Sequence, residues 1–132
     1  RTHFVGSVPY VQLADYYRLC DALVMPAVTR PETGLAVCVP DAMACGKPVV
    51  GSDAAGNPLA IVDGETGFIV PEGDPLALAA RLRDLAVDPD LRARLGRAAR
   101  RRAETELAWP PIARRYLAHF QRLAAQAAGA PA

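Results

Sequence analysis

The sequence predicts a layered α/β fold, and three observations lead to this class. Four short apolar runs lack the strict alternation of half-exposed strands, which is typical of strands buried on both faces of a parallel sheet. Segments with apolar residues at helical spacing lie between these runs and after them. Strand-like and helical segments therefore alternate, which indicates βαβ units. The expected strands are residues 3–5, 23–26, 49–52 and 68–70.

The first predicted helix lies at residues 11–20, between the first two expected strands. Its apolar residues Leu13, Tyr17 and Cys20 are spaced four and three positions apart, so they form one stripe on a helix.

The second predicted helix starts after Thr33 and Gly34 and leads into the strand at residues 49–52. It ends in the sequence Ala-Met-Ala-Cys-Gly, whose small residues allow a helix to approach a sheet closely. Gly46 and Pro48 are placed to end the helix, because glycine accepts the left-handed conformation that follows a helix and proline cannot continue one.

The C-terminal half is predicted to be helical. Asp74 and Asp88 are each followed by proline, which is typical of an N-cap and a first helical residue. The sequence Trp-Pro-Pro at residues 109–111 is expected to break the chain before a last helix. The apolar residues expected to form stripes are Leu78, Leu82 and Leu85, then Leu91 and Leu95, and in the last helix Ile112, Tyr116, Phe120 and Leu123.

Composition limits the class of protein. The chain has 132 residues, 52% apolar and 22% charged, which suits one globular domain and excludes a disordered segment. The net charge of +1 gives no general attraction to nucleic acid or anionic lipid. No apolar run approaches the roughly 20 residues of a membrane span. Three cysteines without a C-x-x-C pair argue against a disulfide framework or a zinc site. We expect reduced, buried thiols in a cytoplasmic protein.

Two acids, Glu32 and Asp41, flank the start of the second predicted helix. Ligands of open α/β sheets bind beyond the carboxyl ends of the strands, and residues 27–34 leave such an end. Backbone N–H groups at the beginning of a helix attract phosphate or hydroxyl oxygens. A carboxylate nearby is suited to accept hydrogen bonds from sugar hydroxyls. Each acid also has a simpler interpretation, as a solvated or helix-capping residue.

Four blocks of sequence, in order, resemble the C-terminal domain of a GT-B glycosyltransferase of the retaining family 4, also called glycosyl transferases group 1. They are "FVGSVPYVQLADYYRLCDALVMPA", "DAMACGKPVV", "DGETGFIVPEGDPLALA" and a tryptophan at position 109 before the last helix. The resemblance covers residues 3 to about 123. It implies a Rossmann-like parallel sheet with flanking helices, truncated at its N-terminus.

The resemblance also implies roles for particular residues. Asp41 is expected to bind the ribose hydroxyls of a nucleotide-sugar donor, and Glu32 is expected to position the transferred sugar. The resemblance implies further donor contacts from Thr33, Gly34, Leu35 and Ala36. The implied reaction is transfer of a hexosyl-type sugar with retention, by leaving-group-assisted front-face attack and without a metal.

The sequence departs from the family pattern at three points. Eight residues separate Glu32 from Asp41 instead of seven, and one residue rotates a regular helix by about 100°, so the two acids would not face the same ligand. A local bulge would absorb the extra residue, and Pro40 offers a place for it. Counting back from Asp41 by the family spacing reaches Thr33. Aspartate at the second acid shortens its reach, and residues 55–59, Ala-Gly-Asn-Pro-Leu, lack the acid of the family's Gly-Gly-x-x-Glu.

Two alternatives stay open at this point: a nucleotide-sugar epimerase of the same fold, and a non-catalytic α/β module that binds a nucleotide or a protein. We expect residues 1–108 to form the nucleotide-sugar-binding part, 109–126 a crossover helix and 127–132 a frayed tail. The acceptor domain is expected to lie outside this sequence, so the isolated chain should not transfer sugar and should either self-associate or fold poorly. Nucleic acid is not an expected partner, whereas peripheral membrane contact of the full enzyme is.

Overall fold

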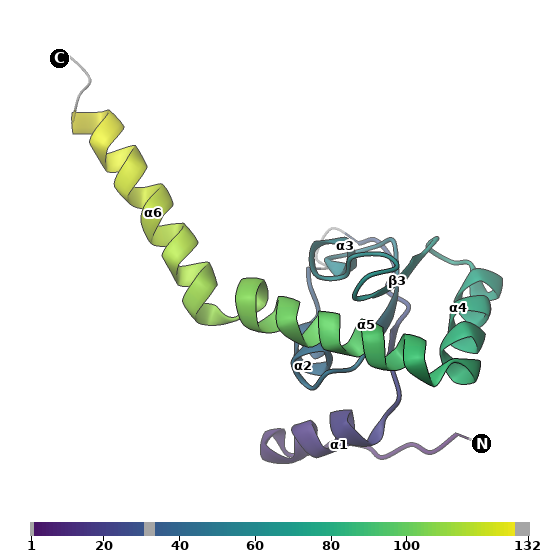
Figure 1. Ribbon diagram of the computed structural model, residues 1–132. Helices are drawn as coiled ribbons and strands as arrows, with labels where there is room; N and C mark the ends of the chain where they lie inside the picture. Colours follow the sequence, from purple (N-terminus) through teal and green to yellow (C-terminus); the bar gives the residue numbers. More distant parts are fainter. Residues whose placement is uncertain (1, 31–33, 129–132) are drawn as a thin grey trace.

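The computed structural model describes residues 2–30 and 34–128, and it contains one parallel sheet of three strands (Figure 1). Strands β1 (Leu23–Met25), β2 (Val49–Ser52) and β3 (Gly67–Val70) lie side by side in sequence order. Val50 pairs with Val24 of β1 and with Phe68 of β3. The α/β class with a parallel sheet is therefore confirmed, and these strands lie within one residue of their predicted positions.

The predicted strand at residues 3–5 is wrong. Residues 2–9 form irregular chain in which Phe4 is 96% exposed and Val5 is 57% exposed. An apolar run becomes a strand only where a neighbouring edge accepts its hydrogen bonds and packs its side chains, and this segment has no such contact within the described chain.

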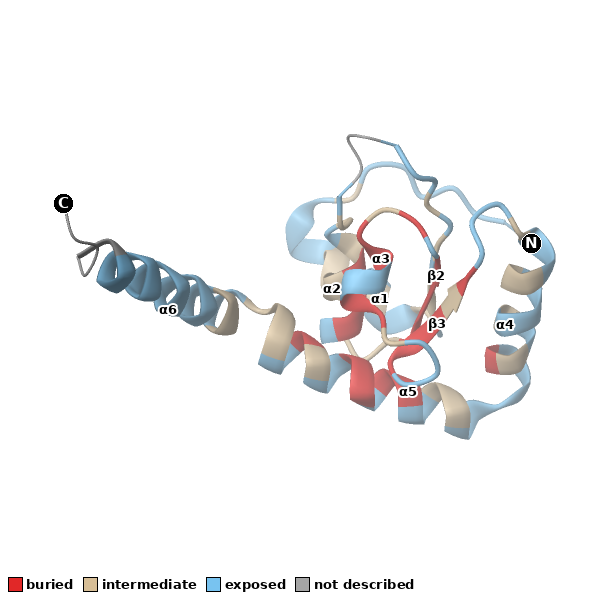
Figure 2. Cartoon of the chain, turned by 90° about the horizontal axis from the view of Figure 1, so that it is seen from above, coloured by how far each residue is buried: buried red, intermediate tan, exposed pale blue. Residues whose placement is uncertain are grey.

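Helices cover both faces of the sheet, and β2 is buried throughout. The helical elements are a 3₁₀ turn η1 (Tyr10–Gln12), α1 (Leu13–Leu19), α2 (Cys38–Ala44), α3 (Asn57–Ala60), α4 (Pro75–Val87), α5 (Pro89–Arg102), a π-helical turn η2 (Ala103–Leu107) and α6 (Trp109–Ala128). Val49 contributes to a core shared with α2, α3 and α5, whereas Val50 contributes to a core shared with α4 and α5. Figure 2 shows the buried residues concentrated along β2, β3 and the inner side of α5.

The helix-terminus signals were mostly reliable. Asp74 accepts hydrogen bonds from the backbone of Leu76 and Ala77, and Asp88 accepts one from Leu91, so both predicted N-caps are confirmed. Gly46 follows α2 with a φ of 74°, as its predicted role as a helix stop requires. The predicted start of that helix is wrong, because α2 begins at Cys38 and residues 34–37 precede it as non-helical chain.

Two glycines allow the backbones of α5 and the end of α2 to meet. A Cβ on Gly96 would lie 2.2 Å from the backbone oxygen of Gly46 and 3.5 Å from Cδ of Pro48. No side chain fits in that space. This contact holds α5 across the end of α2, where Leu95 and Ala99 enter the two cores.

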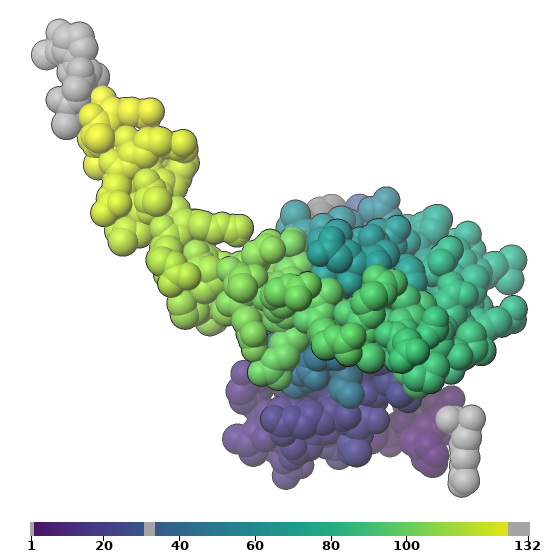
Figure 3. Space-filling view, in the orientation of Figure 1, coloured from purple at the N-terminus to yellow at the C-terminus, as the bar shows by residue number. Residues whose placement is uncertain are grey.

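The last helix leaves the body of the molecule. The chain interrupts its helical course at Ala108, and Trp109 with the two following prolines forms the first turn of α6 instead of the predicted break. Proline suits a first turn because the N–H that it lacks would have no partner there. Figure 1 and the space-filling view in Figure 3 show α6 projecting from the body.

The cysteines are free thiols, as expected, but all three are only partly buried, so the expected full burial is wrong. Partial burial raises the pKa of the Cys20 and Cys38 thiols. Among the described residues, no helix is both long enough and apolar enough to pass through a membrane.

Candidate functional site

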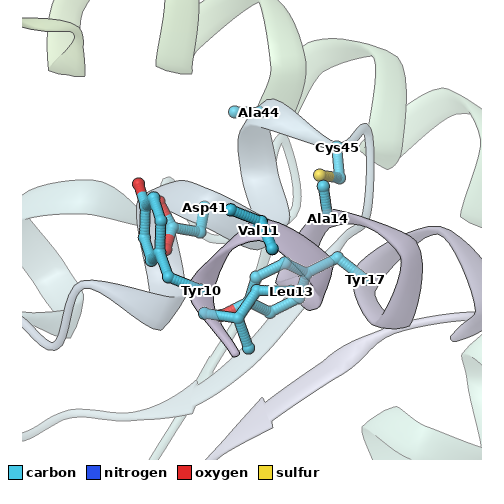
Figure 4. A pocket seen from close by; sticks show the side chains of 8 residues that line it. All are labelled: Tyr10, Val11, Leu13, Ala14, Tyr17, Asp41, Ala44 and Cys45. Atoms are coloured by element: carbon cyan, nitrogen blue, oxygen red, sulfur yellow. The ribbon is translucent and has the colours of Figure 1, made fainter. Parts of the chain in front are cut away.

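Asp41 lies in the first half of α2 and faces a hollow of about 430 Å³ between η1 and α1 on one side and α2 on the other (Figure 4). The hollow is lined by Tyr10, Val11, Leu13, Ala14, Tyr17, Asp41, Ala44 and Cys45. Most of these side chains are apolar, and Asp41 is the acid among them. The hollow therefore combines flat apolar walls with one carboxylate.

The Asp41 carboxylate is able to accept hydrogen bonds from a ligand. Partial burial raises its pKa, and within residues 2–30 and 34–128 it takes part in no hydrogen bond or ion pair. The neighbouring Tyr17 has a raised pKa, chiefly because it is buried and secondly because the Asp41 charge opposes a phenolate. Two carboxylate oxygens without donors, beside an apolar wall, are suited to a ligand that brings hydroxyl groups.

A second hollow of about 390 Å³ opens on the other side of Asp41, toward the base of α6. Tyr10, Asp41 and Ala44 line both hollows, and the second is completed by Val37, Pro40, Ala103, Leu107, Ala108, Trp109 and Ile112. Tyr10 is 79% exposed, so its ring is available as a surface for a planar group. Tyr10 was not among the predicted site residues, and its one signal in the sequence is an aromatic residue directly before the first predicted helix.

The other predicted site residues lie elsewhere. Gly34, Leu35 and Ala36 line neither hollow around Asp41. Leu35 packs against the core, and a Cβ on Gly56 would lie 2.3 Å from its Cα. The Gly34 carbonyl accepts a hydrogen bond from the Gly56 backbone at 3.3 Å. Glu32 and Thr33 are outside the described residues.

The prediction that helical N–H groups begin at Gly34 fails for a physical reason. Residues 34–36 are held against the turn before α3 by the Gly34–Gly56 contact, so they cannot wind into the helix. The Val39 N–H donates to the Ala36 carbonyl at 3.0 Å and the Asp41 N–H donates to the Val37 carbonyl at 3.1 Å. The first turns of α2 therefore satisfy these donors internally.

At the carboxyl ends of β1 and β2, side-chain hydrogen bonds add to the backbone pairing of the two strands. The buried Asn57 amide donates to the carbonyls of Met25 and Ser52, each at 3.1 Å, and so bridges the last residues of β1 and β2. The Ser52 hydroxyl donates to the Ala27 carbonyl at 2.6 Å. Asn57 occupies the segment in which the family acid is missing, and here it has a structural role that the sequence did not reveal.

A carboxylate joins the loops after β1 and β3. Glu72 accepts hydrogen bonds from the Thr29 backbone N–H at 2.9 Å and from the Thr29 hydroxyl at 2.6 Å. These two hydrogen bonds lower the pKa of Glu72. The link therefore stabilises the fold above the ordinary glutamate pKa and is lost as the pH falls through the lowered value.

We expect the Thr29 amide proton to report this titration. Its NMR chemical shift should change with a midpoint below roughly pH 4.3, the ordinary glutamate pKa. Glu72→Gln should abolish the change, and Glu65→Gln, which alters another exposed acid, should leave it intact. A midpoint at or above the ordinary value would contradict the hydrogen-bonded arrangement.

The parallel sheet, the helices on both of its faces and the carboxylate-lined hollow beside α2 define a Rossmann-like α/β domain. The chain belongs to the family of glycosyl transferases group 1, whose model matches residues 1–102. The resemblance to glycosyl transferases group 1 is thus confirmed.

Curated relatives agree with this assignment. The chain is 47% identical over 101 residues to D-inositol 3-phosphate glycosyltransferase of Streptomyces avermitilis, covering 76% of this chain and 21% of that protein. It is 33% identical over 112 residues to glycogen synthase of Mycobacterium tuberculosis, covering 85% of this chain and 26% of that protein. The chain therefore spans about a fifth to a quarter of the length of these relatives.

Solved structures show the same fold. Sucrose-phosphate synthase of Thermosynechococcus elongatus matches with a TM-score of 0.80 and 31% identity, over 94% of this chain and 30% of that one. Anabaena HepE, solved in complex with UDP, matches with a TM-score of 0.71 and 24% identity, over 81% of this chain and 29% of that one. The GT-B architecture expected from the sequence is confirmed by these neighbours.

Proposed function

We propose that this chain is the nucleotide-sugar-binding part of a glycosyltransferase that transfers a sugar to an acceptor with retention. The observation that carries the proposal is the Asp41 carboxylate, which faces an apolar hollow without a hydrogen-bond partner in the described chain. Membership of the family supports the class of reaction. HepE, which shares the fold, binds UDP and UDP-glucose.

A nucleoside suits the chemistry of the hollow. Ribose presents two adjacent hydroxyl donors, and a carboxylate accepts two hydrogen bonds in one plane. The exposed ring of Tyr10 and the side chain of Val11 offer an apolar surface on which a base can lie. Partial burial of Asp41 strengthens such hydrogen bonds, because fewer water molecules compete for the carboxylate oxygens.

The remaining roles follow from the family pattern. We assign Glu32 to positioning the transferred sugar, and the backbone of Thr33 to Ala36 to contacts with the sugar or diphosphate. The bond from the anomeric carbon to the diphosphate breaks, a bond to an acceptor oxygen forms on the same face, and the acceptor proton passes to the leaving diphosphate. No metal takes part in this scheme. Residues 1–108 hold the donor, and residues 109–126 form the crossover helix.

The test is nucleotide binding by the purified chain, measured by calorimetry with UDP, GDP and ADP in turn. Asp41→Asn should weaken the preferred nucleotide about 5- to 100-fold, because ribose hydroxyls lose a charged acceptor. Asp41→Glu should retain binding or improve it, since glutamate restores the reach of the family acid. Asp90→Asn, at an exposed acid in the first turn of α5, is the matched control and should bind like the unaltered chain.

Equal affinities of Asp41→Asn and the unaltered chain would remove Asp41 from the site. Failure of all three nucleotides to bind at millimolar concentration would reject the donor-binding role of this chain. The isolated chain is expected to bind donor without transferring sugar, so activity belongs to the parent enzyme.

A further inference from the structure

The connection from β1 to α2 is held near both of its ends by hydrogen bonds from other elements. Near β1, the Ser52 hydroxyl donates to the Ala27 carbonyl at 2.6 Å. Nearer α2, the Gly56 N–H donates to the Gly34 carbonyl at 3.3 Å. Ser52 is the last residue of β2 and Gly56 directly precedes α3, so both contacts come from buried parts of the body.

Glu72 holds the same connection at another point. Its carboxylate accepts hydrogen bonds from the N–H and the hydroxyl of Thr29, at 2.9 and 2.6 Å. Glu72 belongs to a turn between β3 and α4 in which the Asp74 N–H donates to the Pro71 carbonyl at 3.2 Å. Gly73 has a φ of 73° in this turn, and the Asp74 side chain caps α4. The carboxylate therefore extends from a turn that has hydrogen bonds of its own.

The connection and the start of α4 are separated by a hollow of about 210 Å³. Residues 26–28 of the connection and residues 73–75 both line it. Thr29 and Glu72 are exposed, so buried apolar contact adds little to their pairing. At this place hydrogen bonding, rather than close packing, joins the described part of the connection to the body. Both partners lie within the residues that the family model matches, and the contact requires no free outer surface.

We propose that Glu72 is a positioning residue for the part of the donor that lies beyond the ribose. The inference rests on the proposed function, which assigns the backbone of residues 34–36 to the sugar or diphosphate and Asp41 to the ribose. Asp41 is fixed by α2, whose inner side chains are buried. Glu72 instead holds the connection that precedes α2. Loss of Glu72 should therefore loosen contacts with the sugar or diphosphate and leave the ribose contact in place.

The experiment titrates the 132-residue chain with UMP, UDP and UDP-glucose and follows binding by NMR. The same series is run with GMP, GDP and GDP-mannose, and with AMP, ADP and ADP-glucose. For the preferred base, Glu72→Ala should raise the Kd of the nucleotide sugar roughly 3- to 10-fold, which corresponds to about one lost hydrogen bond. The Kd of the monophosphate should change less than about twofold. A loss that is already present with the diphosphate assigns the effect to the phosphates, and a loss confined to the nucleotide sugar assigns it to the sugar.

Three variants separate position from charge. Glu72→Gln removes the same negative charge, but its amide oxygen can accept from the Thr29 N–H and its amide nitrogen can donate to the hydroxyl. It should therefore bind every ligand like the unaltered chain. Thr29→Val removes only the hydroxyl, so it should cause part of the loss alone and no further loss when combined with Glu72→Ala. Glu65→Ala, at another exposed acid, is the matched control and should have no effect.

Four results would overturn the positioning role. One is an unchanged preference of Glu72→Ala for nucleotide sugar over monophosphate, which would leave donor binding by the chain intact. Another is the same loss in Glu72→Gln, which would assign the effect to charge. A third is an equal loss for monophosphate and nucleotide sugar, which would indicate a general disturbance of the domain. The last is failure of the unaltered chain to bind any of the nine ligands, which would also reject the proposed function.

Discussion

Gly96→Ala is expected to destabilise the protein by about 3 kcal/mol. Alanine usually improves an interior helix position by about 1 kcal/mol relative to glycine. Here the new methyl group would lie 2.2 Å from the Gly46 carbonyl oxygen, which is backbone and cannot move aside as a side chain could. To relieve the clash, α5 must shift away from α2, and both cores lose contacts with Leu95 and Ala99. The steric cost therefore exceeds the gain in helix propensity.

Urea denaturation monitored by circular dichroism measures this effect. Gly34→Ala is the matched control, because a Cβ at Gly34 meets no atom within 4 Å and the residue does not have positive φ. It should change the free energy of unfolding by less than about 1 kcal/mol. A Gly96→Ala protein as stable as the control would show that the two helices do not approach as closely as described.

Asn57→Ala is the second substitution with a large expected effect, about 3 kcal/mol of lost stability. The substitution leaves the Met25 and Ser52 carbonyls without the donor that bridges them and opens a cavity, since Asn57 is 1% exposed. The ends of β1 and β2 then lose their cross-link on the side where the loops of the candidate site begin. Leu59→Ala, at a residue 72% exposed, should cost less than about 1 kcal/mol.

Asn57→Asp separates loss of hydrogen bonding from loss of volume. Its carboxylate would face two carbonyl oxygens, so the folded state favours the protonated acid and raises the pKa of Asp above its unfolded value near 3.9. The protonated side chain keeps one donor, and this contribution is lost as the pH rises through the folded pKa. Relative to the unaltered protein, we therefore expect the variant to be more stable at pH 3.5 than at pH 7. Equal relative stability at both pH values would contradict this arrangement.

Short-range signals in the sequence predicted much of the fold. The three strands are apolar on both faces, and the caps at Asp74 and Asp88 depend on atoms within three residues of each aspartate. The errors arose where a distant contact decides the local structure. Residues 3–5 have the composition of a strand but no sheet edge beside them, and residues 34–36 are held out of α2 by the turn at Gly56.

The candidate site shows the same limit. Asp41 was identified by its position in a motif, and the structure places it beside a hollow, but its neighbours Tyr10 and Val11 are some thirty residues away in sequence. The Asn57 side chain joins carbonyls of two different strands, and no spacing of residues in the sequence predicts this bridge. These contacts join residues of different strands and helices. They depend on how those elements pack together, which short-range patterns in the sequence do not predict.

The strands lie in the sheet in the same order as in the chain, which has a consequence for synthesis on the ribosome. Each new strand pairs with the one made just before it, so the sheet can grow by short loop closures as the nascent chain emerges. Neither core is closed at that stage, because α5 supplies Leu95 to one and Ala99 to the other. Both cores can therefore be completed only after α5 has left the ribosome.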